Sequence, residues 1–138
     1  MLTATPAFYM YELDNWNDAI DIHMAEIEKT VSWLNGAQDV NRDTEANVHI
    51  QTFLNKLQLH RNRKKELIKD IAVLQDYLFN NKLAAGKDHI TIQTKKRQKE
   101  MRNRVYQAER EYIELMYKCN SFLGEHHKST KNGKEDHH

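Results

Sequence analysis

Hydrophobic residues recur along this chain at steps of three and four, which is the period of an α-helix and not that of a β-strand. Three such stripes can be traced. The first comprises Leu13, Trp16, Ile20, His23, Ile27, Thr30 and Leu34. The second comprises Ile50, Phe53, Leu57, His60, Lys64, Leu67, Ile71, Leu74 and Leu78, and the third Met101, Val105, Ala108, Tyr112, Leu115, Cys119 and Phe122. Seams of this heptad type favour long helices packed nearly antiparallel.

Capping residues mark where the helices should begin. Thr5-Pro6 offers an N-cap followed by a first-turn proline, and Asp43 or Thr44 can cap a second helix. Asp88 can cap a third.

Glycines mark where the helices should end. Gly36, Gly86 and Gly124 each follow a stripe, at the place of a left-handed C-cap. We therefore predict helices at about 7–35, 44–85 and 88–123.

These elements predict an all-α fold, an elongated antiparallel three-helix bundle with coiled-coil character. The connections are short enough to make neighbouring helices antiparallel. The bundle would form a single domain over residues 1–124. Residues 125–138 contain nothing apolar to bury, so we expect a disordered polar tail there.

Composition agrees with long helices. The 138 residues include four glycines and one proline, too few for the turns of a β-sandwich or an α/β fold. Cys119 is the single cysteine, which excludes a disulfide scaffold, and its place in the third stripe predicts a buried thiol. No run approaches the ~18–20 apolar residues of a membrane span, and no secretory signal is apparent, so we expect a cytoplasmic protein.

The predicted helices differ in length, at ~42, ~63 and ~54 Å for a rise of 1.5 Å per residue. Helix 7–35 is then expected to end level with Ile71 of the second helix. Beyond Ile71 only the second and third helices would continue, and we call this part the two-helix tip. Several apolar residues there lie off the seam, which predicts a covering partner, either another protein or a second copy of this chain. The predicted partner-binding tip set is Ile71, Leu74, Tyr77, Leu78, Phe79, Leu83, Ile90 and Ile92. Two alternatives stay open: residues 8–11 could cover the tip, or the second helix could break near Asn80-Asn81.

The net charge of +1 conceals an asymmetry. Residues 1–45 contain nine acidic and two basic residues, a net of −7, so the remainder carries +8. In the expected register Asp14 and Asp18 lie near Lys65 and Arg61, Lys64 faces Glu109, and Asp76 faces Arg97. The basic face is less well matched; it comprises Lys95, Lys96, Arg97, Lys99, Arg102 and Arg104. Such a face can bind nucleic acid or another polyanion, which is the alternative function.

Polar residues interrupt the seams at His23, His60 and Lys64, where we expect them to fix the register of the helices. A metal site or a phosphotransfer histidine at His23 or His60 is the third alternative, although neither motif is complete. No catalytic motif, cofactor site or metal-ligand set is readable. The sequence therefore predicts a non-enzymatic protein–protein interaction or assembly module.

Overall fold

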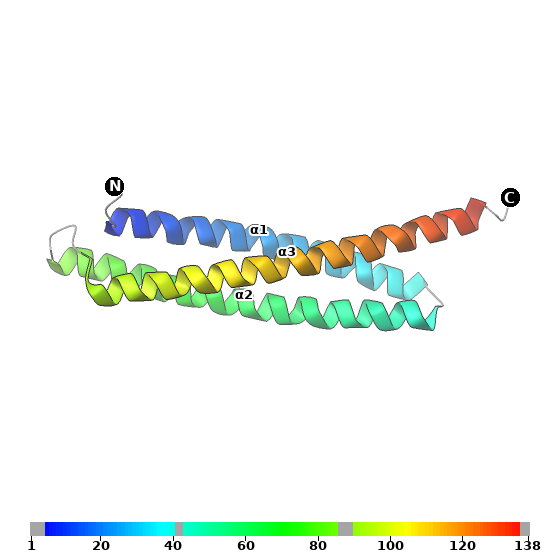
Figure 1. Cartoon of the computed structure of the whole chain (residues 1–138), viewed down its shortest axis with the longest axis horizontal. Coiled ribbons are helices and arrows are strands. Elements are labelled where there is room, and N and C mark those ends of the chain that lie inside the picture. The colour runs from blue at the N-terminus through cyan, green and yellow to red at the C-terminus, as the bar shows by residue number, and fades with distance from the viewer. Residues whose placement is uncertain (1–4, 41–42, 86–89, 136–138) are drawn as a thin grey trace.

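A computed structural model describes residues 5–40, 43–85 and 90–135, which form three long helices and contain no strand (Figure 1). Helix α1 spans Pro6–Val40, α2 spans Thr44–Ala85 and α3 spans Ile92–Glu135. Helices α1 and α3 run in the same direction, and α2 runs antiparallel to both (Figure 1). The predicted all-α three-helix bundle is therefore confirmed.

Short polar side chains cap the starts of all three helices. The Thr5 hydroxyl accepts a hydrogen bond from the Phe8 amide at 3.1 Å, and the Asp43 carboxylate accepts one from the Glu45 amide at 3.0 Å. Both caps are as predicted. The third cap is Thr91, whose hydroxyl accepts from the Thr94 amide at 3.1 Å. Helix α3 therefore begins at Ile92, and its predicted start at residue 88 is wrong; Asp88 itself lies outside the described residues.

Gly36 and Gly124 lie inside helices, so the ends predicted at residues 35 and 123 are wrong. Neither glycine has a positive φ, and a Cβ at either would meet no atom within 4 Å. A glycine inside a helix costs only about 1 kcal/mol relative to alanine, and the strong helix formers Leu34, Ala37 and Gln38 can offset this cost. Gly86 lies outside the described residues. The disorder predicted for residues 125–138 stays a prediction, although the backbone of α3 is helical as far as Glu135.

The predicted stripes form the interior of the bundle. One apolar cluster occupies the half that contains the start of α1, and it is built from Tyr9, Leu13, Ile20, Leu67, Ile71, Leu74, Leu78, Ile90, Met101, Val105 and Ala108. The second occupies the other half and comprises Ile27, Leu34, Ile50, Leu57, Tyr112, Leu115, Met116 and Cys119. Polar residues of the stripes lie between the two clusters.

The start of α1 covers the region that was expected to be a two-helix tip. Tyr9 packs in the same cluster as Leu78 and Ile90. The buried Gln98 side chain donates a hydrogen bond to the Tyr9 carbonyl at 3.2 Å, and Gln75 donates to Asp14 at 2.8 Å. The expectation that the first helix ends near Ile71 is therefore wrong. Because α1 continues past Gly36, it is about 52 Å long and reaches further along α2.

Replacing Gly36 by alanine tests the continuity of α1. We expect Gly36→Ala to raise the free energy of unfolding by about 1 kcal/mol, because the site is helical and has room for a methyl group. Urea denaturation followed by circular dichroism measures this change. A loss of stability would instead indicate a left-handed backbone at Gly36 and a helix that ends there.

Candidate functional site

Most of the predicted tip set is interior. Ile71, Leu74, Leu78 and Ile90 are buried in the first apolar cluster. Tyr77 is half-buried against the same cluster, and the guanidinium of Arg97 lies 4.7 Å from the centre of its ring. These five side chains stabilise the chain itself, because the start of α1 packs over them.

Two members of the tip set are exposed. The side chain of Phe79 is 58% exposed and that of Ile92 is 87% exposed. The side chain of Leu83 lies outside the described residues. Among the described members of the tip set, these two are therefore the ones that present apolar surface to solvent.

The basic face is partly neutralised within the bundle. Arg102 binds the Glu12 carboxylate through two nitrogens, at 2.9 and 2.6 Å, and Arg104 binds Asp70 at 2.8 Å. Arg97, predicted to face Asp76, lies over the ring of the neighbouring Tyr77.

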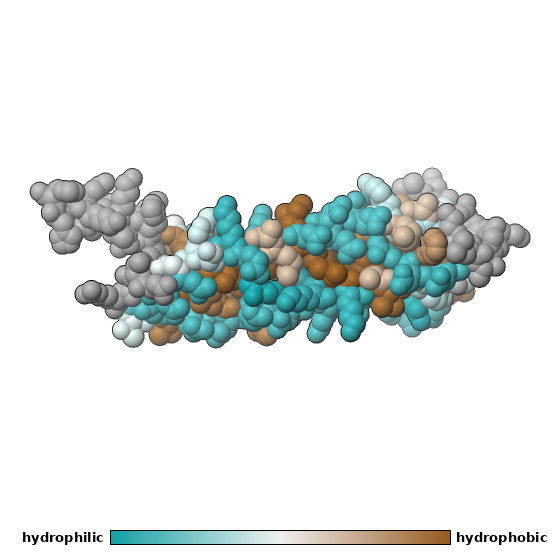
Figure 2. Space-filling view, turned by 180° about the vertical axis from the view of Figure 1, so that it is seen from behind, coloured by the Kyte–Doolittle hydropathy of each residue, from teal (hydrophilic) through white to brown (hydrophobic). Residues whose placement is uncertain are grey.

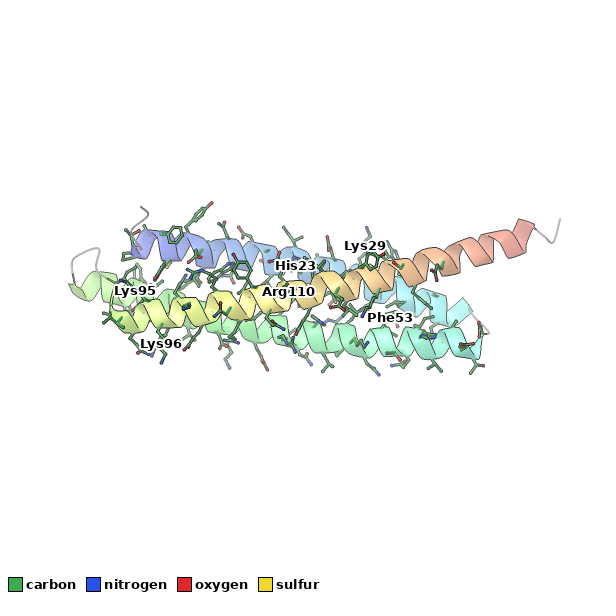
Figure 3. All side chains as sticks on the ribbon, in the orientation of Figure 1. His23, Lys29, Phe53, Lys95, Lys96 and Arg110 are labelled. Atoms are coloured by element: carbon green, nitrogen blue, oxygen red, sulfur yellow. The ribbon has the colours of Figure 1, made fainter. Side chains whose placement is uncertain are left out.

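The three lysines of the basic face, Lys95, Lys96 and Lys99, are exposed, and Figure 3 labels the first two near the start of α3. No salt bridge joins any of them to the other described residues.

The ion pairs predicted between the first two helices are wrong. Arg61 binds Glu28 at 2.8 Å, and Asp14 accepts from Gln75 instead of pairing with Lys65. Both changes follow from the longer α1, which shifts its register along α2. The predicted proximity of Lys64 and Glu109 is confirmed, since the Glu109 charge acts on the Lys64 amine.

A row of large apolar side chains follows the outside of α1. Tyr11, Ile22 and Trp33 are 63%, 61% and 50% exposed. They are spaced eleven residues apart, which is close to three helical turns, so they lie on one side of the helix. The amine of Lys29 lies 4.9 Å from the ring centre of Trp33.

A second row follows α3. Tyr106, Ile113 and Tyr117 are 59%, 58% and 73% exposed, and their spacings of seven and four place them on one side of the helix.

One residue of each row lies beside a contact between α1 and α3. Ile22 is one turn before Glu26, which accepts a hydrogen bond from the Tyr112 hydroxyl of α3. Tyr106 is one turn after Arg102, which binds Glu12 of α1. We call the two rows together the α1–α3 face; it comprises Tyr11, Ile22, Trp33, Tyr106, Ile113 and Tyr117. Sequence reasoning missed it, although the eleven-residue spacing on the first helix was a readable signal.

Figure 2 shows the side of the bundle where α1 and α2 lie side by side. Most of that surface is hydrophilic, and hydrophobic side chains gather along the middle of the bundle.

A layer of polar side chains divides the two apolar clusters at mid-length, where His23 projects from α1 (Figure 3). Lys64 is 1% exposed, and its amine lies 3.2 Å from Nδ1 of His23 and 4.6 Å from the centre of the Tyr112 ring. The His23 and Tyr112 rings stack with centroids 4.0 Å apart. The ammonium of Lys64 therefore donates to an unprotonated Nδ1 and rests against an aromatic face.

Burial dominates the titration of this layer. It lowers the pKa of Lys64 to about 8, although the negative charge of Glu109 acts to raise that pKa. Burial, followed by the Lys64 charge, lowers the pKa of His23. Burial and then the hydrogen bond to Glu26 raise the pKa of Tyr112. The layer therefore contains a neutral His23 imidazole beside the Lys64 amine, and burial disfavours the charged form of that amine.

A cavity of about 40 Å³ adjoins the layer, and its walls include His23, Lys64 and Glu109. It has room for ordered water but not for a substrate of ordinary size. Within the described residues no three histidine, cysteine or acidic side chains are placed to hold a metal ion. This arrangement fits a layer that fixes the register of the helices.

Cys119 is fully buried in the second apolar cluster, as its place in the third stripe predicted. Burial raises the pKa of its thiol to about 11. The thiolate needed for nucleophilic chemistry is therefore scarce at neutral pH.

Comparison of the chain with family models, curated proteins and solved structures found no match. Over the described ranges, no helix is both long and apolar enough to cross a membrane.

Replacing Lys64 by methionine tests the polar layer. We expect Lys64→Met to stabilise the fold by about 1–3 kcal/mol at pH 7, because an apolar chain of similar length avoids burial of the charge. The folded chain releases the Lys64 proton near pH 8 and the unfolded chain near pH 10.5, so the burial penalty fades as pH rises through that window. The gain over wild type should therefore be full below pH 8 and shrink toward pH 10.5.

Urea denaturation at several pH values measures this difference. Lys65→Met, at an exposed position one residue along, is the control and should leave stability nearly unchanged. A destabilised Lys64→Met protein at pH 7 would contradict the interpretation.

Proposed function

We propose that this chain is a non-enzymatic assembly module that pairs with a second copy of itself through the α1–α3 face. The observation that supports the proposal is the alignment of six large apolar side chains, each at least half exposed, along two adjacent helices. Single exposed apolar residues are ordinary on a protein surface, so the proposal rests on the regular spacing of these residues along one side of each helix. The face replaces the predicted tip set, most of which is interior.

Charge complementarity favours a second copy as the occupant. The exposed Asp18 lies one turn before Ile22 on α1, within an acidic helix, whereas Lys99 and Arg110 flank Tyr106 on α3. A two-fold axis parallel to the bundle would set α1 of one copy against α3 of the other, acid against base. A two-fold axis across the bundle would set α1 against α1 and bring like charges together.

Polyanion binding by the basic face remains the alternative function. It rests on the three exposed lysines, Lys95, Lys96 and Lys99, because the three arginines already have partners in the bundle. Binding that weakens steeply with salt would support it.

Introducing charge into the α1–α3 face tests the assembly. We expect the double variant Tyr106→Asp, Ile113→Asp to stay helical and to weaken self-association at least a hundredfold, about 3 kcal/mol. Sedimentation velocity over a range of concentrations measures this. The matched control is Val48→Asp on α2, an exposed apolar position away from the face. A wild-type protein that is monomeric at all concentrations would contradict the proposal.

A charge swap tests the orientation of the two copies. Asp18→Lys should weaken association because it places a cation opposite the basic α3 of the second copy. Arg110→Glu in the same chain should restore much of the affinity. If the double variant associates as weakly as Asp18→Lys alone, α1 does not lie against α3 of the second copy.

A further inference from the structure

Helices α2 and α3 face each other through a ladder of pairs that repeats every seven residues. Tyr77 lies under Arg97, Asp70 binds Arg104, and Arg63 binds Glu111. Moving seven residues toward the N-terminus of α2 corresponds to moving seven residues toward the C-terminus of α3. We call each such pair a rung, and in these three rungs a cation faces an aromatic ring or a carboxylate.

The next rung breaks the pattern. The same step brings Lys56 opposite Lys118, two cations in place of an ion pair. Lys118 lies 3.1 Å from Glu114 on its own helix, in an exposed pair that stabilises little. Lys56 forms no salt bridge with any other described residue. Like charges at facing positions destabilise a helix pair unless an anion lies between them.

The mismatched rung borders a pocket between α2 and α3. Its volume is about 200 Å³, and it is lined by Lys56, Leu59, His60, Arg63, Leu115 and Lys118. Three cationic side chains thus line the pocket, together with a leucine from each helix. Arg63 and Lys118 each bind a carboxylate of α3, whereas Lys56 has no carboxylate partner among the described residues. The volume is below the range of about 300–1,000 Å³ typical of sites for drug-sized ligands, so the pocket suits a small molecule.

His60 adds a group that responds to charge. Its Nδ1 is enclosed and makes no hydrogen bond among the described residues. Burial lowers the His60 pKa, and the charges of Arg63 and Lys64 lower it further. An anion in the pocket would oppose these cations and favour the imidazolium.

We propose that this pocket binds a small organic anion, with a carboxylate or phosphate group between Lys56 and Lys118 and an apolar part against Leu59 and Leu115. Two ammonium groups provide charge-assisted hydrogen bonds to either oxyanion. The pocket lies between α2 and α3, on a different flank from the α1–α3 face. Binding here is therefore independent of the proposed self-association.

The variant Lys118→Glu tests the proposal because it completes the ladder. The introduced carboxylate should pair with Lys56 and weaken anion binding at least tenfold. Titration calorimetry with phenyl phosphate and with phenylacetate on the full chain measures binding, and the two probes distinguish a phosphate from a carboxylate ligand. The control Lys96→Glu makes the same charge change at an exposed position of α3 outside the pocket and should bind like wild type.

A second measurement reports on the pocket directly. We expect phenyl phosphate or phenylacetate to raise the pKa of His60, followed by the NMR shift of its ring protons over pH, and to leave that pKa unchanged in Lys118→Glu. Absence of binding by both probes at millimolar concentration would overturn the proposal. Equal binding by wild type, Lys96→Glu and Lys118→Glu would also overturn it, since the attraction would then be non-specific.

Discussion

Burial of the Lys64 amine is the constraint on which the arrangement of the three helices depends. An ammonium group removed from water needs partners, and this one has the His23 nitrogen, the Tyr112 ring and the charge of Glu109. These partners come from the other two helices. Sliding either helix by one turn would leave the charge buried without them, a far larger penalty than the loss of a few apolar contacts. The apolar clusters on either side supply most of the stability, but shape alone specifies their register less strongly.

The register set by this layer determines which residues face one another at the ends and along the sides of the bundle. It carries α1 far enough along α2 for Tyr9 to pack beside Leu78 and Ile90, so the expected tip becomes part of the core. It also aligns α2 with α3, which pairs Arg63 with Glu111 and, one heptad further, brings Lys56 opposite Lys118. The same alignment thus creates both the stabilising ladder and the cationic pocket.

The uneven charge of the chain serves two purposes in this arrangement. Part of it is used inside the molecule, where Glu12 binds Arg102 and Glu28 binds Arg61. The rest remains on the outside, as an acidic α1 beside a basic α3. This division of charge is the basis of the proposed pairing of two copies of the chain.

The sequence by itself determined the features that depend on neighbours within a few turns. The caps at Thr5 and Asp43, the bounds of α2 and the identity of the buried stripes follow from helix periodicity and local hydrogen bonding, and all were predictable. The helix ends predicted at Gly36 and Gly124 were wrong, because a glycine ends a helix only where neither the neighbouring residues nor the packing favours further helical turns. Only the tertiary structure decided that α1 covers Ile71 and Leu78 and that His23 meets Lys64. These contacts depend on the position of α1 along α2. That position is fixed by contacts between residues far apart in the chain, so it cannot be read from the hydrophobic period of either helix.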